Sequence, residues 1–160
     1  MRIDRIFIHE GGCVMLKVLM LIGSFIFAIS TFAFGQEKFS VSGEISFSEK
    51  KGEFLVWLKT QEEFEKRIEP RSPVRSLVIK PNPHQLKTKN VTFKFVNVPK
   101  DIYCIVFLQD LNQNGKLDHS PETGMPLEQY GYSGQYFFIA QWGDIKFIVD
   151  KDISGIELKF

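Results

Sequence analysis

Short runs in which apolar and polar residues alternate recur along this chain, and they constrain its fold more than any other feature. Residues 39–47 and 90–98 both alternate, which is the period-two pattern of a half-buried β-strand. In the second run the alternation places Val91, Phe93 and Phe95 on one face and extends to Asn97. These two segments are therefore predicted strands, each with one face toward a core.

The remaining segments predict more short strands and no long helix. Residues 53–59 and 102–108 are apolar runs typical of more deeply buried strands. Shorter candidate strands complete the set: 77–79, 135–140, 145–149 and 153–158. The charged segment 61–76 contains two prolines and predicts a loop with one helical turn at 62–67. The Lys50-Lys51-Gly52 turn predicts that 39–47 and 53–59 form a hairpin.

Taken together, these segments predict one all-β domain over residues 36–160. About seven or eight short strands separated by turn residues are typical of a single antiparallel β-sandwich, immunoglobulin-like or prealbumin-like. The chain has no amphipathic helix pattern about 11 residues long, which excludes doubly wound α/β folds.

The N-terminal segment has the composition of a targeting sequence. Residues 18–34 carry no charge, Lys17 precedes them, and Ala33-Phe34-Gly35 supplies small residues at a cleavage site. This layout predicts a signal peptide at 1–35, with Met15 as a second candidate start. The alternative is an uncleaved anchor, because the apolar run lies at the short end of the membrane-spanning range. We therefore expect export to the periplasm or the extracellular space, with membrane contact only through an uncleaved leader.

Charge and cysteine content exclude several classes of partner and site. The chain has 20 basic and 19 acidic residues, and 17 of each remain after residue 35. This balance argues against nucleic-acid binding. Cys104 is the one cysteine after residue 35 and lies in an apolar run. It is predicted to be a small buried core residue rather than a nucleophile.

The segment that follows the 102–108 strand carries the strongest chemical signal. With Asp110 as position 1, side-chain oxygens fall at positions 1, 3, 5 and 9 (Asp110, Asn112, Asn114 and Asp118), and Gly115 stands at position 6. The backbone carbonyl of Lys116 is available at position 7. Oxygen donors at this spacing around a glycine turn are typical of a calcium loop.

The match to a calcium loop has departures. Position 12 is Pro121, and the nearest carboxylate is Glu122, one residue later. Two carboxylates among the first four side chains predict weak binding, toward about 10⁻⁴–10⁻³ M. The alternative is a metal-free hairpin in which Asn and Asp side chains bond their own backbone, with Asn114-Gly115 as the turn. The predicted metal ligands are Asp110, Asn112, Asn114, Lys116, Asp118 and Glu122.

A longer pattern around this loop resembles a known family. Asp-x-Asn-x-Asn-Gly-Lys-Leu-Asp at 110–118 is followed by Gly-x-Pro-x-Glu-x-Tyr-Gly-Tyr-Ser at 124–133 and preceded by Phe-x-Asn-Val-Pro at 95–99. The whole is similar to the bacterial family named domain of unknown function 2141. The resemblance covers most of 39–160 and implies an exported β-sandwich. It implies no reaction, because no activity is established for that family.

Other arrangements are weaker. Glu122 and Glu128 beside Asp118 could serve as an acid and a base on a sugar, although such loop carboxylates are more often structural. Tyr130, Tyr132, Tyr136, Phe137 and Trp142 could stack on a sugar or peptide, but packing is the simpler reading. The sequence contains no recognisable motif of a catalytic triad, a zinc cluster or a phosphate-binding loop.

The sequence therefore predicts an exported, non-enzymatic β-sandwich that binds an unknown protein or glycan and is stabilised by Ca²⁺. The alternative is a metal-free structural or assembly protein of the cell envelope.

Overall fold

The computed structural model describes residues 36–49, 51–70, 72–136 and 138–160. The predicted signal peptide at 1–35, with Met15 inside it, lies outside the described residues. Among the residues described, no helix is both long enough and apolar enough to cross a membrane.

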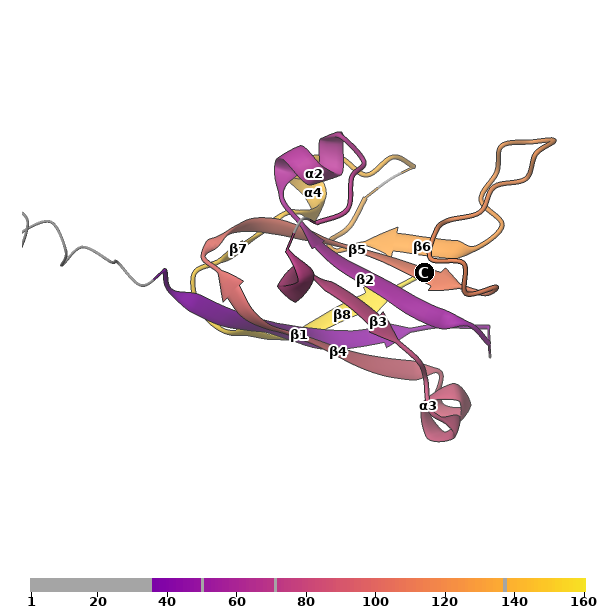
Figure 1. Ribbon diagram of the computed structural model, residues 1–160, viewed down its shortest axis with the longest axis horizontal. Helices are drawn as coiled ribbons and strands as arrows, with labels where there is room; N and C mark the ends of the chain where they lie inside the picture. Colours follow the sequence, from indigo (N-terminus) through magenta and orange to yellow (C-terminus); the bar gives the residue numbers. More distant parts are fainter. Residues whose placement is uncertain (1–35, 50, 71, 137) are drawn as a thin grey trace, which may run out of the picture. The chain divides into compact units, whose positions relative to one another are not determined.

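Two β-sheets make up the domain (Figure 1). The three-stranded sheet has the order β4 (Asn90–Pro99), β1 (Lys38–Ser46), β8 (Ile153–Lys159). The five-stranded sheet has the order β3 (Ser76–Ile79), β2 (Glu53–Lys59), β5 (Asp101–Asp110), β6 (Gln129–Tyr132), and β7 (Phe147–Val149) also pairs with β5. The helical pieces are short: α2 (Gln61–Glu65), the 3₁₀ turn η1 (Pro73–Arg75), α3 (Pro83–Thr88) and α4 (Trp142–Ile145). The prediction of an all-β sandwich is thus confirmed.

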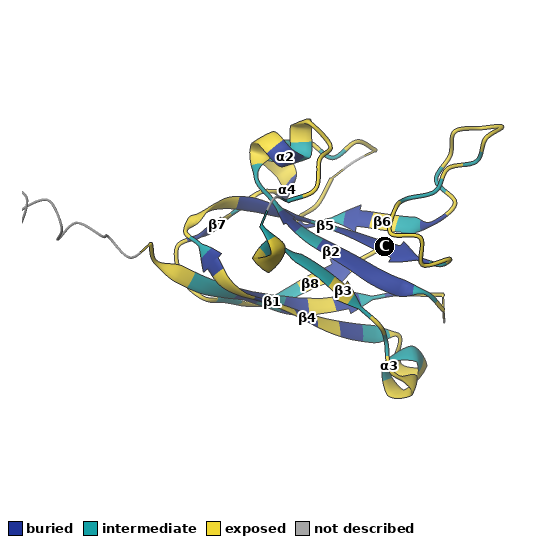
Figure 2. Cartoon of the chain, viewed as in Figure 1, coloured by how far each residue is buried: buried dark blue, intermediate teal, exposed yellow. Residues whose placement is uncertain are grey.

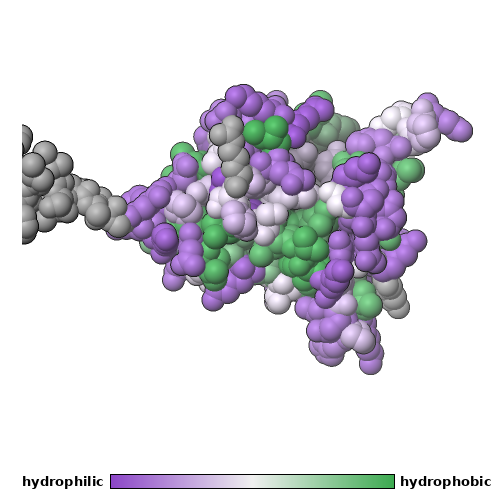
Figure 3. Space-filling view, in the orientation of Figure 1, coloured by the Kyte–Doolittle hydropathy of each residue, from purple (hydrophilic) through white to green (hydrophobic). Residues whose placement is uncertain are grey.

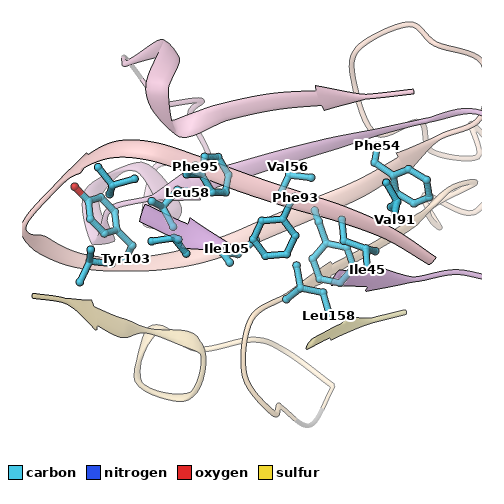
Figure 4. Packing of buried hydrophobic residues seen from close by; sticks show 14 of the residues in the cluster. Ile45, Phe54, Val56, Leu58, Val91, Phe93, Phe95, Tyr103, Ile105 and Leu158 are labelled. Atoms are coloured by element: carbon cyan, nitrogen blue, oxygen red, sulfur yellow. The ribbon is translucent and has the colours of Figure 1, made fainter. Parts of the chain in front are cut away.

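The hydrophobic core lies between the two sheets (Figure 4). Alternate residues of each strand supply it, as the period of two requires. The largest fully buried side chains include Ile45 of β1, Phe54 of β2, Phe95 of β4 and Phe107 of β5. Strands β2 and β5 are buried along most of their length, on both faces (Figure 2).

The predicted hairpin of 39–47 with 53–59 is wrong. Strand β1 pairs with β4 and β8 in one sheet, whereas β2 pairs with β3 and β5 in the other. The turn at Lys51-Gly52 therefore carries the chain from one layer to the other. The β1–β8 pairing is parallel, and the other strand pairings of both sheets are antiparallel. Each of the two strands offers an apolar face, and the turn alone does not decide whether those faces pair edge to edge or pack face to face.

Three further predictions fail for local reasons. No strand forms among the described residues of 135–140, and strand β6 lies earlier, at the Tyr-Gly-Tyr motif. Ile145 ends α4 instead of beginning a strand. Asn97 is exposed, because it adopts φ 59° where the β1–β4 register shifts, and Val98 takes the buried position. A β-bulge of this kind reverses the alternation after the extra residue.

The other predicted elements are confirmed within a residue or two. They are strands β1, β2, β3, β4, β5 and β8, strand β7 within the predicted 145–149, and the helical turn predicted at 62–67, which α2 forms at Gln61–Glu65.

Candidate functional site

The predicted cation loop joins two neighbouring strands of the five-stranded sheet. Strand β5 ends at Asp110, and β6 begins at Gln129 and pairs antiparallel to it. Residues 118–127, called the arm below, form a ladder of their own: Leu127 N–H donates to the Asp118 carbonyl at 2.9 Å, and Ser120 N–H donates to the Met125 carbonyl at 2.8 Å. The arm extends beyond the ends of β5 and β6 (Figure 1).

Asp110 holds the first turn of the loop. Its side chain is fully buried at the end of β5. One carboxylate oxygen accepts the N–H groups of Gln113 at 2.6 Å and Asn114 at 3.2 Å, and the other accepts the N–H of Gly115 at 2.7 Å. Gln113 and Gly115 have φ 60° and 82°, so the chain curls around the carboxylate in the left-handed region that glycine favours. A buried carboxylate with three backbone donors is a strong local anchor.

Two of the predicted side-chain ligands, Asn112 and Asn114, converge on a third, Asp118. The amide nitrogens of Asn112 and Asn114 donate to the same Asp118 oxygen, at 2.6 Å and 2.8 Å. Their amide oxygens accept backbone N–H groups, of Asn114 and Lys116 respectively. Each amide oxygen keeps a second lone pair. The polar side chains of the loop therefore bond to one another and to the backbone of the turn around Gly115.

The structure does not bring Glu122 to this group. Glu122 is exposed in the turn of the arm, and it forms no hydrogen bond with the other five predicted ligands in the described part of the chain. Lys116 is exposed beside Gly115, where its N–H is bonded to Asn114.

Glu128, which the sequence-based ligand set omits, ties the two ends of the loop together. Its carboxylate is buried, and its two oxygens accept the N–H groups of Leu111 at 2.7 Å and Asp118 at 3.1 Å. Glu128 is 18 positions from Asp110, too far for a single-loop pattern. Glu128 lies immediately before β6, which pairs with β5, and this pairing places its carboxylate against the start of the loop. Because no strand was predicted at 129–132, the sequence carried no signal for this role.

The donor set of the loop defines what the site can hold. It consists of the carboxylates of Asp110 and Asp118, the amides of Asn112 and Asn114, and backbone carbonyls. Within the described residues, no three His, Cys, Asp or Glu side chains lie close enough to hold a metal ion. Hard oxygen donors with few carboxylates fit a weakly held calcium ion.

The segment after the loop locks β6 into the sheet. A Cβ on Gly131 would lie 2.6 Å from the Phe107 ring, so only glycine lets β6 approach the core here. The buried Ser133 hydroxyl donates to the Ile145 carbonyl at 2.7 Å and accepts the Ile105 N–H at 2.8 Å. Gly134 has φ 84°, and a Cβ there would lie 2.3 Å from the Asp144 carbonyl oxygen. The Gly-Tyr-Ser-Gly run therefore serves packing.

The aromatic residues after the arm form a row on the outer side of the five-stranded sheet. Tyr132 makes edge contacts with Tyr130 at 5.9 Å and Tyr136 at 5.5 Å between ring centroids, and with Phe64 of α2 at 5.7 Å. Trp142 of α4 lies 6.0 Å from Phe64. Burial raises the pKa values of the Tyr132 and Tyr136 hydroxyls. The row lies outside the core between the sheets, and Phe137 lies outside the described residues.

A known protein family matches most of this chain. Residues 33–156, which include the whole loop and the Gly-Tyr-Ser-Gly run, match the family described as an uncharacterized protein conserved in bacteria, domain of unknown function 2141. The chain belongs to this family. No curated protein and no solved structure matches it.

In this domain of unknown function 2141 protein, Cys104 is buried on the outer side of β5. Burial raises the pKa of its thiol to about 12, so the thiolate is nearly unpopulated at neutral pH. This agrees with the prediction of a buried core residue, although Cys104 lies on the face away from the inter-sheet core.

We expect Cys104 to resist alkylation while the protein is folded. Iodoacetamide at pH 8 should leave the Cys104 peptide unmodified over hours, and the same reagent in denaturant should modify it completely, because thiolate is the reacting form. Peptide mass spectrometry measures both. Rapid modification of the folded protein would contradict this account of the thiol.

Proposed function

We propose that this family member works outside the cytoplasm as a non-enzymatic β-sandwich that binds a protein or glycan, with a loop stabilised by calcium. The observation that carries the calcium part is the convergence of Asp110, Asn112, Asn114 and Asp118 on one bend around Gly115. The proposal of export rests on the composition of residues 1–35.

Calcium would be held by two carboxylates and two amides, with the Lys116 carbonyl as a further oxygen. In the metal-free hydrogen bonding, the amide nitrogens of Asn112 and Asn114 face Asp118. Binding therefore requires both amides to turn their oxygens inward, which breaks two hydrogen bonds. This cost and the low carboxylate count together favour an affinity near about 10⁻³ M, as in extracellular modules.

Thermal unfolding tests the calcium site. At 10 mM Ca²⁺ and a Kd of about 1 mM, linkage predicts about 1.4 kcal/mol of added stability. For a domain of this size that corresponds to a rise in Tm of about 4–8 °C. Magnesium at the same concentration should produce a much smaller rise, because it demands a tighter octahedral site.

Two variants that each remove one negative charge distinguish direct binding of calcium by a side chain from a general electrostatic effect. Asp118→Asn keeps an acceptor oxygen for the two amides and should abolish the calcium-induced rise in Tm. Glu122→Gln removes the same charge from the exposed turn of the arm and should leave that rise intact. No calorimetric heat and no rise in Tm at 10 mM Ca²⁺ would overturn the proposed site, and so would equal effects of the two variants.

The second candidate is a metal-free structural or assembly protein with the same fold. It is favoured by one observation, that the loop already satisfies its polar groups through Asp110, Glu128 and the two amides. In that case calcium changes nothing, and the loop is only a stiff support for the arm.

A non-enzymatic role is supported by the chemistry of the described residues. The Cys104 thiol is buried and protonated. The Asp110 and Glu128 carboxylates are occupied by backbone N–H groups. Groups already committed to holding a loop are poorly placed to exchange protons with a substrate.

A further inference from the structure

A cleft lies where the beginnings of α2, β5 and α4 meet. Its volume is about 360 Å³. It is lined by Thr60, Gln61, Glu62, Asp101, Ile102 and Trp142. Helices α2 and α4 lie side by side there (Figure 1). Asp101 begins β5, whereas Asp110 ends it, so this cleft and the loop that starts at Asp110 lie at opposite ends of the same strand.

The lining of the cleft combines apolar surface with polar groups. Trp142 is half-buried and Ile102 is 39% exposed, and these two residues supply the apolar surface. The other four lining residues are polar, and hydrophilic residues cover α2 at the surface (Figure 3). A few polar groups beside an apolar surface are typical of a small-molecule site, and such sites measure about 300–1,000 Å³. The cleft therefore has the size and composition of a ligand site.

The polar groups of the cleft are mainly oxygen acceptors. The Asp101 carboxylate accepts the Ile102 N–H through Oδ1 at 2.7 Å, and its Oδ2 forms no hydrogen bond with a described residue. The amide nitrogen of Gln61 donates to the Glu65 carboxylate at 2.7 Å, which leaves the Gln61 amide oxygen for a ligand. The cleft thus suits a ligand that donates several hydrogen bonds.

The two carboxylates that line the cleft have basic neighbours. Glu62 accepts a hydrogen bond from the Lys66 ammonium group at 2.7 Å, and Asp101 interacts electrostatically with the Arg75 guanidinium. None of the described residues that line the cleft is basic. An anion finds no cation in this lining, and a cation gains little from carboxylates whose charge is already partly balanced. An uncharged ligand is therefore favoured.

We infer that this cleft binds a neutral sugar unit of a glycan. A pyranose ring has a face of C–H groups and a periphery of hydroxyl groups. The Trp142 ring suits the C–H face, and the carboxylate and amide oxygens suit the hydroxyl groups, because O–H groups form short, strong hydrogen bonds with carboxylates. The inference rests on the proposed function, which names a protein or a glycan as the partner, and it selects the glycan.

The elements around the cleft are fixed by contacts of their own. Ile145 of α4 is 1% exposed, and its carbonyl accepts the buried Ser133 hydroxyl at 2.7 Å. A capping box of Thr60 and Glu63 fixes the start of α2. The ring of Trp142 lies 6.0 Å from that of Phe64. A sugar therefore meets side chains on ordered backbone, which reduces the entropic cost of binding.

A larger hollow on the outer face of the three-stranded sheet lacks these features. Its volume is about 660 Å³, and its lining side chains are polar or charged apart from Phe93 and Ile156, which pack in or against the core. Phe93 is 3% exposed, so it offers no ring face to a sugar. The smaller cleft is therefore the better candidate for a glycan.

A printed array of neutral oligosaccharides, probed with the purified protein in EDTA, tests the inference. Titration calorimetry with the oligosaccharide that binds most strongly then gives the Kd. Trp142→Ala and Asp101→Asn should each raise this Kd by at least about tenfold, because each removes a group that contacts the sugar. Added Ca²⁺ should leave the wild-type Kd unchanged, because no residue of the cleft belongs to the loop that starts at Asp110.

Phe138→Ala and Asp150→Asn are the matched controls, since both residues are exposed and neither lines the cleft. Both should keep the wild-type Kd. Circular dichroism should show all four variants folded, and Asp101→Asn decides alone if Trp142→Ala does not fold.

Three results would overturn the inference, and they bear differently on the proposed function. If none of the oligosaccharides binds, a protein remains as the proposed partner. If one binds and either folded cleft variant binds it as tightly as the wild type does, or the controls weaken binding equally, glycan binding stands and its site lies elsewhere. Binding that EDTA abolishes would place the site at the calcium loop.

Discussion

Replacing Asp110 with alanine should lower the free energy of unfolding by about 3 kcal/mol. The variant removes a buried carboxylate that accepts three backbone N–H groups, of Gln113, Asn114 and Gly115. Hydrogen bonds to a charged group contribute about 1.5–3 kcal/mol each, and water entering the exposed loop recovers part of the loss. Urea unfolding in calcium-free buffer with EDTA measures the change and isolates it from any metal.

Graded substitutions check the cause. Asp110→Asn keeps one acceptor oxygen and should lose less stability than Asp110→Ala. Asn112→Ala removes the amide that bonds Asp118 at the exposed side of the loop and should cost well under half as much. If Asp110→Ala and Asn112→Ala prove equal in stability, Asp110 is not the anchor of the loop.

Arg75→Leu should destabilise the domain by about 3–5 kcal/mol, the range for breaking a buried ion pair by removing one partner. Arg75 and Glu63 form a two-bond pair, one at 2.8 Å between a guanidinium nitrogen and a carboxylate oxygen, and their side chains are 11% and 8% exposed. Arg75 also donates to the Leu58 carbonyl at 3.1 Å and lies over the Tyr103 ring. The hydrogen bond to Glu63 raises the pKa of Arg75, so the guanidinium stays charged throughout the working pH range.

This pair joins α2 to the 3₁₀ turn η1 beside the end of β2. The Glu63 carboxylate also accepts the Thr60 N–H at 2.9 Å, which completes the capping box of α2. A double variant, Arg75→Leu with Glu63→Leu, removes both charges and should be more stable than Arg75→Leu alone. Urea unfolding of the two single variants and the double variant completes the cycle. A coupling energy near zero would show that the pair contributes nothing.

The fold was predictable where the physical cause is local. Strands β1, β4 and β5 were predicted from the alternation in 39–47 and 90–98 and from the apolar run at 102–108. Alternation predicts a strand because successive side chains of a strand point to opposite faces of the sheet. The connection between β1 and β2 was not predictable in this way. Its turn at Lys51-Gly52 is compatible with both a hairpin and a crossing between sheets, and the partners of β1 lie 44 to 113 residues away.

In the candidate site, too, the contacts between residues close in sequence were predicted and the contacts between distant residues were not. The spacing of Asp110, Asn112, Asn114 and Asp118 predicted that their polar groups meet, since a glycine-centred turn brings alternate residues to its inner side. Glu122 was favoured as the last ligand because of its sequence position alone. The antiparallel return of the arm instead carries Glu122 to the exposed turn and places Glu128 against the start of the loop.

By itself, the sequence determined most of the strands, their buried faces, the family and the curled turn after Asp110, because each depends on residues a few positions apart. Only the tertiary structure decided which strands are neighbours and that Glu128 closes the loop. Those features arise when strands distant in the chain are brought into register, and an alternating pattern specifies which face of a strand is apolar without specifying what lies against it.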